Sequence, residues 1–214
     1  MRNYQAAVLL VCLMQIGCKS TSYFNTPNDV LETKAMLYMK NGSKKEGNIT
    51  VLFETGHTAK EFIELTSNNL KEKIPIDSIR CYQIKNNFYY PRILDYELNG
   101  SENLLFVKRL SNDSSLIHLF ELYVRNPANS TSPETYYYFL SFPKQDSTRP
   151  INIASKKIMP NFDEKMGKLV EDCPQLAYKV KTKAKGYFLP QISFGNTRKT
   201  EILLRIINEY NSCR

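Results

Sequence analysis

Between residues 35 and 153 the chain alternates short runs of β-branched and aromatic residues with clusters of Asn, Asp, Ser and Gly. Such runs are typical of strands, and turn residues recur about every ten positions, as in antiparallel sheets. Asn41-Gly42 is the strongest short signal for a hairpin, because both residues readily adopt the positive φ angles of a tight turn. The pattern predicts an antiparallel β-sheet or a small barrel rather than βαβ units. The predicted strands are 35–40, 44–53, 61–65, 74–76, 79–84, 88–96, 104–110, 116–124 and 136–142.

In the last quarter of the chain the spacing of apolar residues changes to that of helices. A first helix is predicted from Asn161, as its N-cap, to a point near Cys173. Pro174 suits the opening position of a second helix, which Gly186 would end. A third helix would follow Thr200 as its cap. The apolar stripes of the three helices are Phe162, Met166, Leu169 and Val170; Leu176, Ala177 and Val180; and Ile202, Leu203, Ile206, Ile207 and Tyr210.

The N-terminus has the pattern of a signal peptide. Arg2 supplies positive charge, and residues 6–14 form one uninterrupted apolar run. The run is too short for a transmembrane helix, which needs about 20 residues. An exported protein is therefore expected.

The residues after the apolar run, Leu13-Met14-Gln15-Ile16-Gly17-Cys18, resemble the lipobox of bacterial lipoproteins. The resemblance implies that Cys18 is acylated and that cleavage before it leaves this residue as the lipid-carrying N-terminus. Gln15 departs from the aliphatic residue usual at its position. The alternative is an ordinary secretory signal whose cleavage site contains a cysteine.

These patterns divide the chain into four parts. Residues 1–17 form the lipoprotein signal peptide, and residues 18–33, polar and interrupted by Pro27, form the lipidated cysteine and a flexible tether. Residues 34–155 form the antiparallel β region, and residues 156–214 form a C-terminal helical region packed on it. The expected fold class is α+β, with an antiparallel sheet or small barrel followed by about three helices.

The order of motifs after the tether resembles a loose group of secreted Bacteroidota proteins of unknown function. The motifs are a hairpin with Asn41-Gly42 and Gly47, the segment Ile76-Asp77-Ser78-Ile79, a Tyr-rich strand, Asp172-Cys173-Pro174 and a terminal Tyr210-Asn211-x-Cys213. The resemblance covers roughly residues 34–213 and implies a compartment and an architecture, but no catalytic residues. Surface-exported lipoproteins of this phylum usually carry acidic residues after the lipidated cysteine. Lys19 and Ser20 stand there instead, so we expect an outer-membrane, lipid-anchored protein that faces the periplasm.

Sequence motifs for catalysis, metals or cofactors are nearly absent. The two histidines, His57 and His118, have no metal-ligand spacing, and His118 in an apolar run is typical of a structural strand histidine. Ser141-Phe142-Pro143-Lys144 matches the S-x-x-K pattern of penicillin-recognising enzymes, but it lies in a predicted strand and the companion motifs are missing. We therefore expect no metal and no cofactor, and a protein that is not an enzyme.

The charge is concentrated towards the C-terminus. The chain carries a net charge of +8, and the last 64 residues hold 12 Lys or Arg against 6 Asp or Glu. Lys179, Lys181, Lys183 and Lys185 alternate with uncharged residues, which would place four amines on one side of a strand, whereas on a helix they would spread around the surface. This spacing suggests an anionic partner, such as lipopolysaccharide phosphate, an acidic polysaccharide or nucleic acid; a solvated surface is the favoured alternative.

Two classes of function remain open. The first is a membrane-anchored envelope lipoprotein that acts as a non-enzymatic binding or interaction module. The alternative is an envelope hydrolase with an unrecognised active site. The expected partners are the membrane, through the N-terminal lipid, and an envelope protein or an anionic glycan, whereas nucleic acid is disfavoured. A deep cleft with convergent polar groups of perturbed ionisation would favour the enzyme.

Two serines resemble acceptors of O-glycans in the periplasm of Bacteroidota. Asp77-Ser78-Ile79 and Asp146-Ser147-Thr148 both match the pattern of an acidic residue, a hydroxyl residue and an aliphatic residue or threonine. Ser147 is the preferred site, because it lies in a polar loop that a transferase can reach.

The cysteines predict one disulfide. Cys12 leaves with the signal peptide and Cys18 carries lipid, so three of the five cysteines remain in an oxidising compartment. Cys81 lies in a predicted central strand, where a free thiol acts as a small apolar residue. Cys173 and Cys213 lie at helix boundaries, where short segments can adjust to disulfide geometry, and we expect them to be bonded. The alternative is that both are free.

Overall fold

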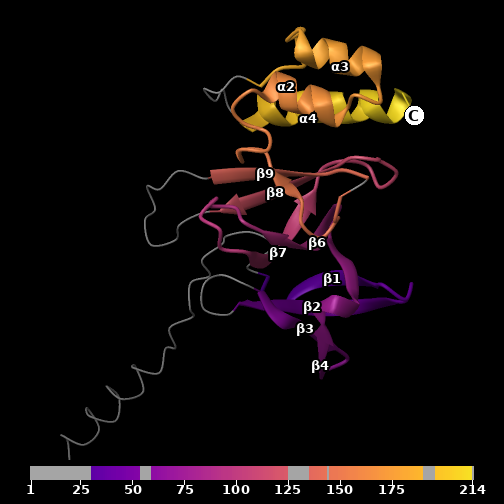
Figure 1. The fold of residues 1–214 in the computed structure, drawn as a ribbon. Helices are drawn as coiled ribbons and strands as arrows, with labels where there is room; N and C mark the ends of the chain where they lie inside the picture. Colours follow the sequence, from indigo (N-terminus) through magenta and orange to yellow (C-terminus); the bar gives the residue numbers. More distant parts are fainter. Residues whose placement is uncertain (1–29, 54–58, 125–134, 144, 190–195, 214) are drawn as a thin grey trace, which may run out of the picture.

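The computed structural model describes residues 30–53, 59–124, 135–143, 145–189 and 196–213. In these residues a sheet of ten strands is followed by three helices, the α+β fold that the sequence predicted (Figure 1). The strands are β1 (Thr33–Met39), β2 (Lys44–Phe53), β3 (Ala59–Ser67), β4 (Leu70–Pro75), β5 (Ile79–Ile84), β6 (Asn87–Leu94), β7 (Asn103–Arg109), β8 (His118–Val124), β9 (Thr135–Ser141) and β10 (Ile151–Asn152). The helices are α2 (Phe162–Leu169), α3 (Pro174–Lys181) and α4 (Asn196–Cys213).

The sheet is built from two antiparallel meanders that meet at β1. Its strand order is β10-β9-β8-β7-β6-β5-β1-β2-β3-β4, so β1 pairs with both β2 and β5. A short 3₁₀ turn, Ile76–Ser78, leads the chain from edge strand β4 to β5. Among the described strands β4 and β10 are the two ends of an open row. Of the two predicted architectures, a sheet or a small barrel, the structure therefore has the sheet.

Two strands differ from the sequence prediction. The predicted strand 74–76 is the end of β4, which begins at Leu70 after a turn at Asn68 and Asn69, with φ angles of 50° and 62°. Strand β4 lies at the edge of the sheet and most of its side chains are exposed. Its sequence therefore lacks the alternation of apolar residues by which a strand is predicted. The two-residue strand β10 was not predicted at all.

The sheet curls so that its first strands cover one face of its middle strands. Strand β3 lies against β7, and one core cluster joins Leu37, Ile49 and Ile63 to aromatic residues of β5 and β7. Tyr82 stands at the centre of this cluster, with its ring centroid 4.9 Å from that of Phe106. Burial of these side chains supplies the main driving force for closing the first half of the sheet.

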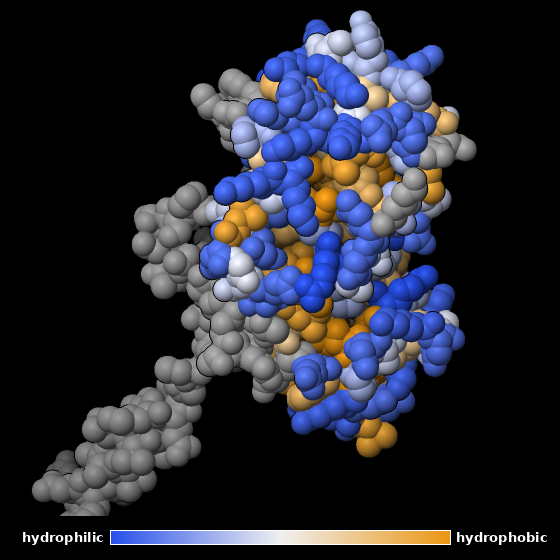
Figure 2. Space-filling model, in the orientation of Figure 1, coloured by the Kyte–Doolittle hydropathy of each residue, from blue (hydrophilic) through white to orange (hydrophobic). Residues whose placement is uncertain are grey.

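The three helices form a layer over β8 and β9, at the top of Figure 1. Leu119 and Leu140 of the strands and the buried stripes of all three helices belong to one core cluster. On the face seen in Figure 2, apolar surface is visible between this layer and the strands. The helical stripes therefore serve packing, as the sequence indicated.

Asn161 occupies the predicted N-cap position of the first helix without making a capping bond, and the predicted cap of the third helix is wrong. Asn161 precedes α2 but adopts a left-handed conformation, with φ of 63°, and its side chain forms no capping hydrogen bond. Helix α4 begins at Asn196, four residues before the predicted cap Thr200. Thr200 is a half-buried residue inside the helix.

The second helix ends at Lys181 rather than near Gly186. Lys183 adopts a left-handed conformation, with φ of 56°. Its N–H donates to the carbonyl oxygen of Val180 at 3.1 Å, and the N–H of Ala184 donates to that of Lys179 at 2.9 Å. This pair of bonds is a Schellman motif, which usually has glycine at the left-handed position, and a lysine there gives no signal in the sequence.

The folded domain begins before the predicted end of the tether. Val30 is buried, and its carbonyl oxygen accepts a hydrogen bond of 2.9 Å from the N–H of Val51. The tether of residues 18–33 is therefore too long by at least four residues, because an apolar side chain at its end packs on the sheet. Cys18 lies outside the described residues. No helix in the described part of the chain is long and apolar enough to cross a membrane.

Candidate functional site

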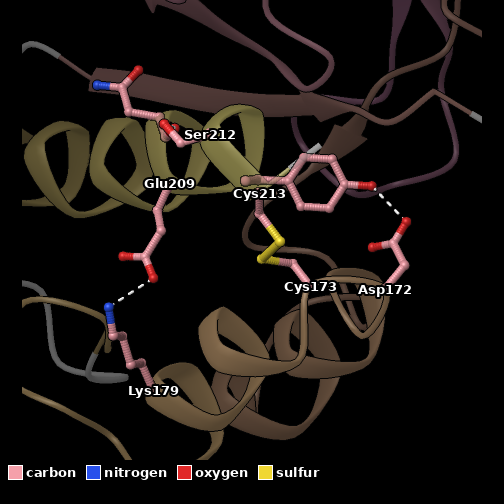
Figure 3. Close-up of a disulfide and its surroundings, with 8 residues drawn as sticks. Asp172, Cys173, Lys179, Glu209, Ser212 and Cys213 are labelled. Carbon is pink, nitrogen blue, oxygen red and sulfur yellow. Dashed lines mark hydrogen bonds and ion pairs between the residues drawn. A yellow bond between two sulfur atoms is a disulfide. The ribbon is translucent and has the colours of Figure 1, made fainter.

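The predicted disulfide frames one end of the helical layer. Cys173 and Cys213 are bonded, with their Cα atoms 6.0 Å apart, and the bond joins the start of α3 to the end of α4 (Figure 3). The hydroxyl of Tyr210 donates a hydrogen bond of 2.9 Å to Asp172, beside the disulfide. Cys81 is a free, fully buried thiol in β5, as the sequence indicated.

A cavity of about 660 Å³ lies beside this framework, where the helical layer meets the ends of β8 and β9. Five of its lining residues offer apolar surface, and the others carry amines, carboxylates or an amide. The cavity combines apolar walls with a few polar groups, which is typical of small-ligand sites. It is lined by Leu116, Phe142, Pro143, Gln145, Lys157, Lys165, Lys168, Leu169, Glu171, Asp172 and Tyr210.

The three lysines of the cavity have different roles. The amine of Lys165 donates to the carbonyl oxygens of Lys156 at 2.6 Å and Met159 at 3.3 Å, so it fixes the loop before α2. Lys157 and Lys168 are exposed at the rim. With Lys165 they outnumber the carboxylates of Glu171 and Asp172 in the same lining by one, which leaves a small positive charge that attracts anions.

Gln145 contributes an unusual polar group. Its side-chain oxygen Oε1 is buried and accepts no hydrogen bond in the described residues, although the residue lines the cavity. A buried acceptor without a donor is unfavourable by about 1–3 kcal/mol. A ligand with an N–H or O–H group would satisfy it.

The lysines predicted as an anionic-ligand patch do not form a row on a strand. Lys179 and Lys181 lie in α3, whereas Lys183 and Lys185 follow it. The amine of Lys179 is 2.7 Å from Glu209, and that of Lys183 is 3.4 Å from Asp163. Helical spacing spreads the amines, as expected for a helix, and two of them pair with carboxylates, so the one-sided row that a strand would give is absent.

The hydrogen bond from Lys179 to Glu209 also perturbs both groups. It raises the pKa of Lys179. Burial acts to raise the pKa of Glu209, but hydrogen bonds from Lys179 and Tyr187 outweigh it and lower that pKa. The network joins α3 to α4 and is structural in character.

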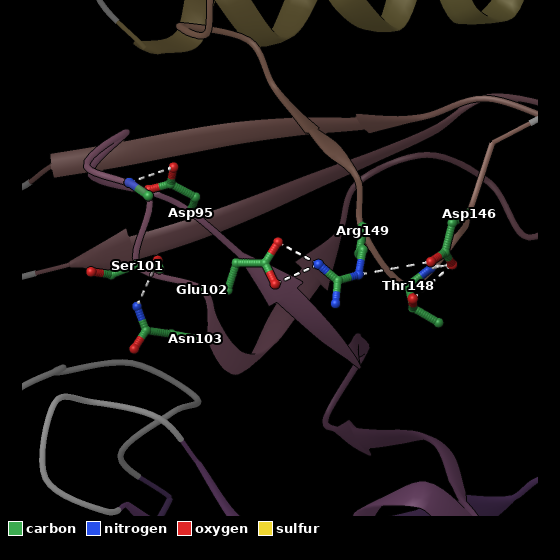
Figure 4. A network of polar contacts seen from close by, with 8 residues as sticks. Asp95, Ser101, Glu102, Asn103, Asp146, Thr148 and Arg149 are labelled. Atoms are coloured by element: carbon green, nitrogen blue, oxygen red, sulfur yellow. Dashed lines mark hydrogen bonds and ion pairs between the residues drawn. The ribbon is translucent and has the colours of Figure 1, made fainter.

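The two predicted glycan acceptors differ in accessibility. Ser147 is exposed in a turn, whereas Ser78 is half-buried and its hydroxyl donates to the carbonyl oxygen of Pro75 at 2.6 Å. The turn of Ser147 is held in place by Asp146, which accepts hydrogen bonds from the N–H and hydroxyl of Thr148, and by Arg149, which pairs with Glu102 (Figure 4).

The ionisable side chains of the cavity are lysines, carboxylates and a tyrosine. Among its described lining residues there is no serine, threonine, cysteine or histidine, whereas lysine, carboxylate and tyrosine side chains, which also serve as bases or nucleophiles in enzymes, are present. Ser141 of the S-x-x-K match is buried in β9, and Lys144 lies outside the described residues, as does His57. No cluster of metal-ligating side chains is present in the part of the chain that the structure describes.

Sequence reasoning missed the cavity because its residues come from four separate segments. They lie just before β8, just after β9, around α2 and near the end of α4. The excess of lysines after residue 151 was the only available signal, and it gave the charge of the region without its shape.

Comparison with known proteins adds no family. A scan against protein-family models, a search of curated proteins and a search of solved structures each found no match. The fold and the site define the class by themselves: an α+β domain with a disulfide-framed cavity between its sheet and its helices.

Proposed function

We propose that this chain is a bacterial envelope lipoprotein whose folded domain is a non-enzymatic binding module, with the cavity as its ligand site. The cavity carries the proposal, because it joins apolar walls to the exposed amines of Lys157 and Lys168 and to the unpartnered oxygen of Gln145. These groups suit an anionic partner that also presents an apolar portion and a hydrogen-bond donor. An acidic segment of an envelope protein or an anionic glycan has this chemistry.

The anchor in this proposal is lipid on Cys18, in the outer membrane and facing the periplasm. The lipobox-like sequence and the apolar run before it support this placement. The polar residues between Cys18 and Val30 would tether the domain near the bilayer surface. Several acyl chains hold a protein firmly, because each buried methylene contributes about 0.8 kcal/mol. An O-glycan on the exposed Ser147 is part of the same proposal.

Replacing the anchor residue tests the membrane attachment. Cys18→Ser should move the protein from the membrane fraction to the soluble fraction of native cells and abolish incorporation of a labelled fatty acid. Cys12→Ser is the matched control, since it changes a cysteine of the apolar run and should leave labelling intact. Absence of label from the unmodified protein would contradict the proposal.

The ligand site is tested by photo-crosslinking in living cells. A benzophenone side chain at Lys168, on the cavity rim, should capture a defined partner that mass spectrometry identifies. The same group at Tyr178, which is 70% exposed on α3, is the control. The control should not give the same adduct. Identical adducts from both positions would show that the cavity does not select its partner.

A further inference from the structure

A second polar cluster lies on the sheet, apart from the residues that line the cavity. Arg92 of β6 and Arg109 of β7 both stack on the ring of Tyr90, with their Cζ atoms 5.3 Å and 4.6 Å from its centroid. Arg92 also lies over Phe120 of β8, at 4.8 Å. The two guanidinium groups therefore contact the same aromatic ring, and their Cζ atoms are at most about 10 Å apart, the sum of the two distances to Tyr90.

The cations of this cluster are poorly matched by anions. Arg109, whose side chain is 9% exposed, pairs with Asp113 at 2.5 Å. Arg92 donates through Nη1 to the carbonyl oxygen of Pro91 at 2.7 Å, and its buried Nε has no acceptor in the described residues. Arg80 of β5 adds a third charge close enough to act on Asp113.

Asp146 does not correct this imbalance. The negative charge of Asp146 acts on Arg92. However, its Oδ1 accepts two hydrogen bonds from Thr148, and its Oδ2 lies 4.0 Å from the Nε of Arg149. It is thus shared with Arg149, which also pairs with Glu102. Counted together, the four arginines at positions 80, 92, 109 and 149 face the three carboxylates of Asp113, Asp146 and Glu102, which leaves an excess of one positive charge at the cluster.

The two weak acids beside the arginines, the Tyr90 hydroxyl and the Cys81 thiol, are neutral at physiological pH. Burial raises the pKa of Tyr90 to about 12 and also raises the pKa of Cys81. Burial, together with the charge of Arg109, lowers the pKa of Arg92 to about 10, so this guanidinium remains charged. Burial and the two arginines lower the pKa of His118, whose buried Nδ1 has no partner in the described residues. Half-buried cations without a counter-charge are unfavourable unless an anion joins them.

We propose that Arg92, Arg109 and Arg80 form a binding site for a phosphate group, carried either by a soluble phosphate ester or by a lipid headgroup. A phosphate group carries at least one negative charge at neutral pH and so balances the excess, and it offers more acceptor oxygens than a carboxylate for bridging separate guanidinium groups. Arginine forks bind phosphate oxygens in pairs, and hydrogen bonds of about 2.7–3.2 Å on either side let one phosphate bridge two guanidinium groups. The site uses none of the residues that line the cavity and does not depend on the function proposed above.

Titration of the mature, oxidised protein with inorganic phosphate tests the site. Calorimetry at low ionic strength should show one saturable site, and the NMR signal of the Arg92 Nε–H should shift with the same affinity. Arg92→Gln should weaken binding by about ten-fold or more, because a charged double donor is lost. Lys85→Gln, which removes an exposed charge from the β5–β6 turn, should leave the affinity unchanged.

A second variant covers failure of Arg92→Gln to fold. Arg109→Lys keeps the charge but loses the planar fork, and it should also weaken binding several-fold. Vesicles of phosphatidylcholine with phosphatidylglycerol distinguish the two sources: binding to vesicles as well as to free phosphate assigns a headgroup, and binding to free phosphate alone assigns a soluble ester. Absence of saturable phosphate binding, or equal affinity in the arginine variants and the unmodified protein, would overturn the proposal.

Discussion

Replacing Cys173 and Cys213 together by alanine is expected to lower the free energy of unfolding by about 4 kcal/mol. The bond closes a loop between residues 40 positions apart, and removing it restores the conformational entropy of this loop in the unfolded chain. The effect is large compared with the 5–15 kcal/mol total stability typical of a domain. Urea denaturation, followed by the loss of helical circular dichroism, measures it.

The reduced, unmodified protein provides the matched comparison. Its unfolding midpoint should fall to that of the double alanine variant, because both lack the same crosslink. The ligand cavity should respond as well, since Asp172 and Tyr210 belong to its lining and stand next to the two cysteines. A loss below about 1 kcal/mol in both samples would contradict the loop-closure explanation.

The disulfide between Cys173 and Cys213 was predictable from the sequence. Elimination among three cysteines left Cys81 in a strand and paired the two at helix boundaries, and the structure agrees. The hairpin at Asn41-Gly42 and the opening of α3 at Pro174 were predictable for a similar reason. Each depends on local chemistry within a few residues.

The two candidate sites depend on contacts between distant segments. Alternation along a strand places Tyr90 and Arg92 on one face of β6, but only the pairing of β6 with β7 brings Arg109 to the same ring. The cavity needs the helical layer to meet the segment after β9, including Gln145. Lys183, and not Gly186, occupies the left-handed position that ends α3, and a lysine gives no sequence signal for it.

Replacing Asn152 by alanine is expected to lower the free energy of unfolding by about 3 kcal/mol, although β10 has only two residues. Asn152 is buried, and its Nδ2 donates to the carbonyl oxygens of Asp95 at 3.3 Å and Tyr96 at 3.2 Å. Its Oδ1 accepts from the N–H of Ala154 at 2.9 Å. Alanine would remove these three hydrogen bonds and would separate the edge of the sheet from the loop after β6.

Asn99→Ala is the matched control, because Asn99 makes two side-chain hydrogen bonds in the same loop but is exposed. Water can replace those bonds, so the expected loss is below about 1 kcal/mol.

Asn152→Asp separates hydrogen bonding from size, since a carboxylate keeps the acceptor for Ala154 but faces two carbonyl oxygens. It should destabilise the protein at least as much as alanine does at pH 7. Its stability should recover as the pH falls and the carboxyl group becomes a donor, since the two carbonyl oxygens hold its folded pKa above the unfolded value. Equal stabilities of the Asn152 and Asn99 alanine variants would show that β10 is not held by this amide.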